Sequence, residues 1–207
     1  MTIKAILFDM DGVLIDARDW HYRALNKALK HFGYNISIES HLSTFDGLPT
    51  KEKLKLLSKS LGLPYKLHEL INLLKQKYTI QESYFNCKPK FNHRYALSRL
   101  SKNYKIAICS NSIKNTINTL MRLSSLDSYI DLVISNEDVK IPKPDPDMYL
   151  KAMNHFALDP KECLIVEDND NGVKAAIASG GHLIRVGEPD DVTFELLNQR
   201  IIDINNS

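Results

Sequence analysis

The chain has 207 residues, of which 43% are hydrophobic and 25% charged, and its formal net charge is +2. This balance, without a basic block, gives no reason to expect nucleic acid or an anionic membrane as a partner. No apolar run is long enough for a membrane span, and the first residues enter a strand rather than a signal peptide. We therefore expect a cytoplasmic protein without a membrane partner. Cys87, Cys109 and Cys163 form no C-x-x-C pair and are expected to be buried and reduced.

The first predicted element is an apolar strand that ends in two acids and a glycine. Residues 3–8 are apolar apart from Lys4, and Asp9, Asp11 and Gly12 follow them. This run predicts a buried parallel strand that brings both carboxylates to the C-terminal edge of a sheet, where open α/β folds bind ligands. Two acids one residue apart suit an oxygen-preferring cation and a covalent step at a carboxylate.

The next part of the chain has only helical periodicity. Apolar residues recur at helical spacing from Trp20 to Phe32, from Leu54 to Leu61 and over residues 67–78. No strand pattern interrupts residues 17–86. This block therefore predicts a small α-helical bundle.

Helices and strands then alternate to the end of the chain. Strands are expected over residues 105–109, 132–135, 163–166 and 183–186, each preceded by a helix, over 93–100, 113–123, 146–156 and 173–178. This alternation predicts an α/β fold, a doubly wound, Rossmann-like parallel sheet that includes the first strand. We expect one core domain of residues 1–16 and 88–207, with the helical bundle of residues 17–87 inserted into it.

Three later strand ends also carry polar side chains. Ser110 and Asn111 open a helix after the second strand, where a hydroxyl and free N–H groups form an anion site or an ordinary helix cap. Lys143 lies between two prolines that stiffen its loop, and such a fixed cation suits a phosphate or a nucleophilic Asp. Glu167 and Asp168 follow the strand over residues 163–166.

The four strand ends together predict an acidic site. Asp9, Asp11, Glu167 and Asp168 would repel one another at one sheet edge unless a divalent cation bound there. Oxygen ligands alone favour Mg²⁺ over zinc.

With these motifs the chain resembles the haloacid dehalogenase superfamily of phosphotransferases, in the branch with a helical cap inserted after the first motif. Within it, the chain is most similar to the beta-phosphoglucomutase-like and sugar-phosphate phosphatase group. The motifs are Asp9-Met10-Asp11-Gly12-Val13, Ser110-Asn111, Lys143 in Lys-Pro-Asp-Pro, and Glu167-Asp168 followed by Gly172. The similarity extends over nearly the whole chain.

The resemblance implies roles for the core motifs. Asp9 would be the nucleophile that forms an aspartyl phosphate, and Asp11 the general acid and then the general base. Lys143, Ser110 and Asn111 would bind phosphoryl oxygens.

The resemblance also implies a metal site. Mg²⁺ would be held by the Asp9 carboxylate, the Asp11 backbone carbonyl and Asp168, with support from Glu167.

The cap segment differs from that of the mutases in this group. They carry an arginine shortly after the cap glycine that grips a second phosphate, whereas this chain has Gly47-Leu48-Pro49-Thr50-Lys51. Lys51 lacks the bidentate fork of an arginine. His21 matches a hinge histidine of the mutases, and it also fits an ordinary surface position. His21 and Lys51 are our candidates for substrate contacts in the cap, and Lys75 and Lys77 are nominated beside them.

We therefore expect a monomeric, Mg²⁺-dependent phosphatase that acts on a small-molecule phosphate ester of a sugar or polyol. The alternative is a hexose-phosphate mutase, which hands the phosphoryl group back to its product. A dehalogenase would leave Asp11 without a task. A non-enzymatic scaffold would have no reason to keep four polar strand ends.

Overall fold

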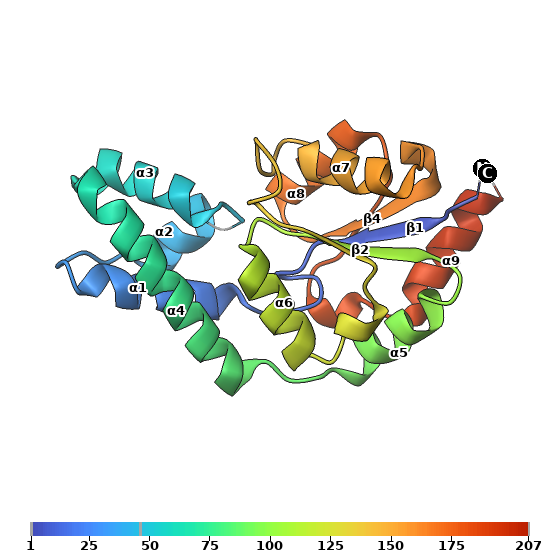
Figure 1. The fold of residues 1–207 in the computed structure, drawn as a ribbon, viewed down its shortest axis with the longest axis horizontal. Coiled ribbons are helices and arrows are strands. Elements are labelled where there is room, and N and C mark those ends of the chain that lie inside the picture. Colours follow the sequence, from blue (N-terminus) through green and yellow to red (C-terminus); the bar gives the residue numbers. More distant parts are fainter. Residues whose placement is uncertain (1, 46, 207) are drawn as a thin grey trace. The chain divides into compact units, whose positions relative to one another are not determined.

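The computed structural model describes residues 2–45 and 47–206. It divides into two compact units, one formed by Met1–Asp16 with Lys88–Ser207 and the other by Ala17–Cys87 (Figure 1). Within the described residues, every helix is too short or too polar to cross a membrane.

The first unit is built on a five-stranded parallel sheet with the strand order β3-β2-β1-β4-β5. The strands are β1 (Ala5–Phe8), β2 (Lys105–Cys109), β3 (Leu132–Ile134), β4 (Cys163–Glu167) and β5 (His182–Arg185). Strand β1 is central, and its Phe8 pairs with Ile108 of β2 and Val166 of β4. The strand order reverses beside β1, which is where open α/β sheets form a ligand crevice at their carboxyl ends. The predicted parallel α/β fold is thus confirmed.

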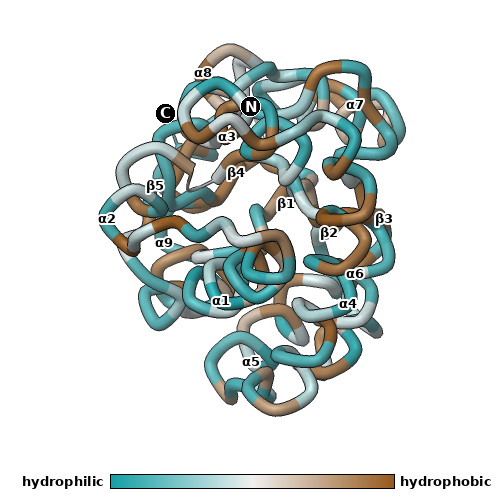
Figure 2. Tube along the Cα trace, turned by 90° about the vertical axis from the view of Figure 1, so that its left-hand side faces the viewer, coloured by the Kyte–Doolittle hydropathy of each residue, from teal (hydrophilic) through white to brown (hydrophobic). Residues whose placement is uncertain are grey.

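Helices cover both faces of this sheet. They are α5 (Phe91–Leu100), α6 (Lys114–Leu123), α7 (Asp147–Phe156), α8 (Asp170–Ser179) and α9 (Phe194–Asn205). Helices α7 and α8 lie on one face, and α5, α6 and α9 lie on the other (Figure 1). Alternate strand residues point to opposite faces, so Leu7, Cys109 and Ile165 pack against α7 and α8. Figure 2 shows the hydrophobic character of these strands.

The second unit is entirely helical in its described residues. It contains α1 (Arg18–Lys30), α2 (Ile38–Ser40), a π-helical turn (His41–Phe45), α3 (Thr50–Leu61), a 3-10 turn (Tyr65–Leu67) and α4 (His68–Asn86). Helices α1 and α4 pack along each other, and a core that includes Leu25, Leu54 and Ile71 joins them to α3.

Two of the longer helices differ most from the sequence prediction. Helix α4 continues eight residues beyond the predicted end at residue 78. The prediction stopped early because the buried face of this last part carries Thr79 and Ser83 instead of apolar residues. Helix α9 had no predicted counterpart. Its buried Leu197, Ile201 and Ile204 have helical spacing, and the Thr193 side chain caps its first turn.

Candidate active site

The carboxyl ends of two neighbouring strands bring three carboxylates together. Asp9 follows β1, Glu167 is the last residue of β4, and Asp168 comes directly after it. One carboxylate oxygen from each lies within 4.8 Å of the others. All three side chains are buried, and Glu167 is 0% exposed. We refer to these three residues as the acidic cluster.

Two glycines leave the space that this cluster occupies. Gly12 has a φ of +90°, and a Cβ there would lie 2.0 Å from Asp168 Oδ2. A Cβ on Gly172 would lie 1.9 Å from Glu167 Oε1. Any larger residue at either position would collide with a cluster carboxylate. Glycine is therefore required at both positions, because the backbone there lies close to Asp168 and Glu167.

A buried ammonium group joins the cluster. Lys143 is 3% exposed, and its Nζ donates to Asp9 Oδ1 at 2.7 Å, to Glu167 Oε1 at 2.6 Å and to the Cys109 carbonyl oxygen at 2.6 Å. These contacts use all three of its N–H donors. The side chain of Asn111 holds the backbone of Lys143 through two hydrogen bonds, one to its N–H and one to its carbonyl oxygen.

The electrostatics of the cluster follow from burial and charge. Burial alone would lower the pKa of Lys143, but the carboxylates of Asp9 and Glu167 raise it above its ordinary value. Burial raises the pKa of Asp9, the Lys143 ammonium counteracts this, and Glu167, Asp168 and Asp11 raise it further. With all three carboxylates ionised, the cluster and the Lys143 ammonium carry a formal charge of −2 together. An all-oxygen donor set with this charge fits a divalent cation such as Mg²⁺.

Asp11 lies beside the acidic cluster without joining it. Its side chain is half-buried, and its Oδ2 accepts a hydrogen bond of 3.0 Å from the Ser112 hydroxyl. The prediction had not included Ser112 among the site residues. The alternation Ser110-Asn111-Ser112 after β2 was the available signal.

Ser110 is buried at the end of β2. Its N–H donates to the Ile134 carbonyl oxygen, and its Oγ accepts from the Ser112 N–H at 3.1 Å. Helix α6 begins only at Lys114, whose N–H donates to Glu137 Oε2 at 2.7 Å. The N–H groups of Ser110, Ser112 and Lys114 therefore have protein partners, and the anion-site alternative cannot rest on these three groups. The side-chain amide of Asn111 is likewise hydrogen-bonded to the Lys143 backbone.

Helix α7 adds a residue that the sequence prediction missed. The hydroxyl of Tyr149 donates to Glu167 Oε1 at 2.5 Å, and its ring centroid lies 4.8 Å from Lys143 Nζ. The sequence predicted a helix over residues 146–156, but no pattern indicated this contact.

In the helical unit, basic side chains from three helices, α1, α3 and α4, gather around His41. His21 Nδ1 lies 3.2 Å from Lys75 Nζ, and Lys53 and Lys75 are both 6% exposed. Burial, with Lys53, His21 and Lys75, lowers the pKa of His41 to about 4. We call His21, His41, Lys53 and Lys75 the basic cluster. The predicted Lys51 is exposed and outside it, whereas Lys53 and His41 had not been predicted as site residues.

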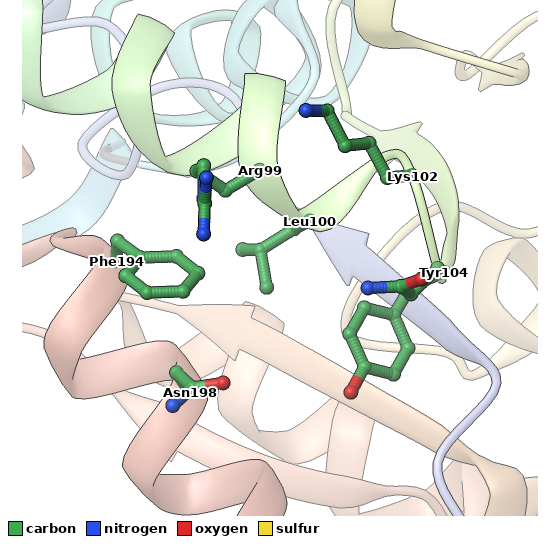
Figure 3. Close-up of a pocket in the computed structure, with 7 residues that line it drawn as sticks. Arg99, Leu100, Lys102, Tyr104, Phe194 and Asn198 are labelled. Carbon is green, nitrogen blue, oxygen red and sulfur yellow. The ribbon is translucent and has the colours of Figure 1, made fainter.

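A pocket of about 330 Å³ lies elsewhere in the first unit, where α5, α9 and the segment before β2 meet (Figure 3). It is lined by Arg99, Leu100, Lys102, Asn103, Tyr104, Phe194 and Asn198. Tyr104 immediately precedes β2, so this pocket lies at the N-terminal edge of the sheet, opposite the acidic cluster.

Known proteins share the sequence pattern and the fold of this chain. A model of the family described as haloacid dehalogenase-like hydrolase matches residues 6–186. A phosphorylated carbohydrates phosphatase of Thermotoga maritima is 28% identical over 181 residues, covering 86% of this chain and 82% of that protein. A probable pseudouridine-5'-phosphatase of Saccharomyces cerevisiae is 31% identical over 203 residues, covering 92% and 85%. The crystal structure of a beta-phosphoglucomutase from Clostridium difficile has the same fold, with a TM-score of 0.85, 21% identity and full coverage of both chains.

Proposed function

This chain belongs to the haloacid dehalogenase-like hydrolases, and from that premise we propose a phosphatase that hydrolyses a sugar or polyol phosphate with Mg²⁺. The observation that carries the proposal is the contact of the buried Lys143 ammonium with both Asp9 and Glu167. Phosphoryl transfer needs fixed charges around a nucleophile more than it needs difficult covalent chemistry. The phosphorylated carbohydrates phosphatase among the relatives supports this class of substrate.

Asp9 is the proposed nucleophile. One of its carboxylate oxygens forms a bond to phosphorus while the bond between phosphorus and the ester oxygen breaks. Asp11 donates a proton to the departing alkoxide and later removes one from the water that hydrolyses the aspartyl phosphate. The hydrogen bond from Ser112 to Asp11 Oδ2 supports this role, because it fixes the direction of that carboxylate.

The acidic cluster is the proposed metal site. Asp9, Asp168 and Glu167, with the Asp11 backbone carbonyl, would hold Mg²⁺, which would supply positive charge against the phosphoryl oxygens. Lys143 and Ser110 would bind the phosphoryl group. Since all three N–H donors of Lys143 already have partners, it must share one of them with the substrate.

We propose that the helical unit acts as a cap and that its residues determine which substrate is accepted. Its basic cluster favours esters that carry a second anionic group, because a buried ammonium is stabilised by a nearby anion. Lys53 and His21 are the residues proposed to act in this choice. Lys51 is exposed and is not expected to contribute.

The test is release of inorganic phosphate from a panel of phosphate esters, with and without Mg²⁺. We expect Mg²⁺-dependent release from sugar or polyol phosphates and a loss of more than about 100-fold in kcat for Asp9→Asn, equivalent to about 3 kcal/mol or more. An Asp9→Asn enzyme above that level would contradict the aspartyl phosphate. Glucose 6-phosphate formed from beta-glucose 1-phosphate with a trace of the bisphosphate would instead identify the mutase.

A further inference from the structure

Glu167 is held by donors on both of its carboxylate oxygens. Oε1 accepts from Lys143 Nζ at 2.6 Å and from the Tyr149 hydroxyl at 2.5 Å. Oε2 accepts from the Asp168 N–H at 3.2 Å. The space beside Gly172 is filled by this carboxylate, so the group has little freedom to turn.

Tyr149 contacts both members of the buried ion pair. Its hydroxyl shares Oε1 of Glu167 with Lys143, and its ring centroid lies 4.8 Å from Lys143 Nζ. A phenol hydroxyl keeps its proton at neutral pH, so the Tyr149 hydroxyl is the donor in this contact. A hydrogen bond to a buried charged group is stronger than one between neutral partners.

The position of Tyr149 in the chain couples it to the Lys143 loop. Residues 142–146 carry Lys143 and lead directly into α7, which begins at Asp147. The Tyr149 N–H donates to the Pro146 carbonyl oxygen at 2.9 Å, so the tyrosine belongs to the first turn after this loop. The first turn of α7 therefore positions both the loop that carries Lys143 and the Tyr149 hydroxyl.

We propose that Tyr149 is a positioning residue of the phosphoryl-transfer site, acting through Glu167. By sharing Oε1, it keeps the Lys143 ammonium divided between Glu167 and Asp9, and it fixes the Glu167 carboxylate that faces the metal site. Without the hydroxyl, Glu167 Oε1 loses one of its two donors, and the Lys143 ammonium is drawn toward Glu167 and away from Asp9. The kinetic consequence rests on the proposed phosphatase activity, whereas the consequence for metal binding rests only on the proposed metal site.

The test is Tyr149→Phe, which removes only the hydroxyl and leaves the ring in place. We expect kcat to fall roughly 10- to 100-fold with KM within about threefold. We also expect the Mg²⁺ concentration for half-maximal rise in unfolding temperature to increase by about tenfold, the usual effect of losing a partner of a metal-holding carboxylate. The control is Tyr104→Phe, since Tyr104 lines the pocket at the opposite edge of the sheet (Figure 3) and is expected to leave both values unchanged.

A double-mutant cycle with Glu167→Gln separates positioning from packing. If Tyr149 acts through Glu167, the hydroxyl contributes less once Glu167 is neutral, so the two losses are not additive. The cycle is measured both in kcat and in Mg²⁺ binding followed by calorimetry. Additive losses, or a Tyr149→Phe enzyme within twofold of wild type in both measurements, would overturn the proposal.

The outcomes also separate this inference from the proposed function. A wild-type protein that releases phosphate from no ester, but whose Mg²⁺ affinity falls in Tyr149→Phe and couples to Glu167→Gln, keeps the positioning role and refutes the phosphatase. If the wild type is an active phosphatase and Tyr149→Phe is unaffected, the proposed function stands and the positioning role of Tyr149 is refuted.

Discussion

Asn111 and Lys143 are joined by a pair of hydrogen bonds. Asn111 Oδ1 accepts from the Lys143 N–H, and Asn111 Nδ2 donates to the Lys143 carbonyl oxygen, both at 3.1 Å. This clamp ties the loop between two prolines to the end of β2, and it sets the direction from which the Lys143 ammonium enters the acidic cluster.

Asn111→Ala is expected to lower kcat by at least about tenfold, because a small displacement of a catalytic side chain is costly. Two net hydrogen bonds of about 1 kcal/mol each predict a loss of about 2 kcal/mol in the free energy of unfolding. The matched control is Asn26→Ala, since Asn26 clamps the N–H and carbonyl oxygen of Ile36 in the helical unit at 2.9 Å each. Asn26→Ala should lower the free energy of unfolding by a similar amount and leave kcat unchanged. Equal kcat losses in the two variants would show that the Asn111 clamp has no special role.

Gly12→Ala tests whether the acidic cluster depends on close approach of the backbone. The new Cβ would lie 2.0 Å from Asp168 Oδ2, so either the turn or the carboxylate must move. We expect the Mg²⁺ concentration for half-maximal activity to rise by about tenfold or more. Gly62→Ala is the control, because Gly62 also has a positive φ, +69°, but among the described residues no heavy atom beyond its chain neighbours lies within 4 Å of its would-be Cβ. It should lose about 1 kcal/mol of stability through backbone strain alone. An unchanged Mg²⁺ requirement in Gly12→Ala would contradict the proposed role of Asp168.

The parts of this site that the sequence predicted are those at strand ends. Asp9, Glu167 and Asp168 meet because parallel strands β1 and β4 are neighbours, and an apolar run followed by acids is enough to indicate this. The predicted parallel sheet depends on the same local pattern. Long-range side-chain contacts have no such signal. Tyr149 reads as one more apolar position of α7, although its hydroxyl reaches Glu167.

The helical unit was harder to predict for a related reason. Helical periodicity assigns buried positions to apolar residues, so a buried Lys53 and an exposed Lys51 cannot be told apart by residue type. The same limit explains the early predicted end of α4, where Thr79 and Ser83 occupy the buried face.

Lys53→Met and Lys51→Met test the basic cluster against its exposed neighbour. Methionine keeps most of the side-chain volume and removes the charge. For Lys53→Met we expect KM to rise about tenfold on esters with a second anionic group and by less than about threefold on esters without one. Lys51→Met should change neither value. If Lys53→Met affects both kinds of ester alike, Lys53 supports the fold of the helical unit and does not select the substrate.

His41 makes the stability of the protein depend on pH. It is 1% exposed, and neither ring nitrogen has a hydrogen-bond partner among the described residues. Its pKa is lowered to about 4 from the ordinary 6.5, by burial first and then by Lys53, His21 and Lys75. Between these two values the unfolded chain binds a proton that the folded protein does not. The stabilising contribution is therefore complete above pH 6.5, and it is lost as the pH falls toward 4.

The change from pH 7.5 to pH 5 should remove about 2 kcal/mol through His41, at about 1.4 kcal/mol for each pH unit below 6.5. His41→Phe keeps a buried aromatic ring beside Tyr22, which lies 5.2 Å away between ring centroids, and it removes the titrating group. Urea unfolding of both proteins at the two pH values gives the comparison. The loss for His41→Phe should be smaller than that of the wild type by this amount, because every other titrating group, including the buried His93, contributes equally to both proteins. If the two proteins lose the same free energy of unfolding, His41 accepts a proton in the folded state, and the basic cluster then has more access to water than its burial indicates.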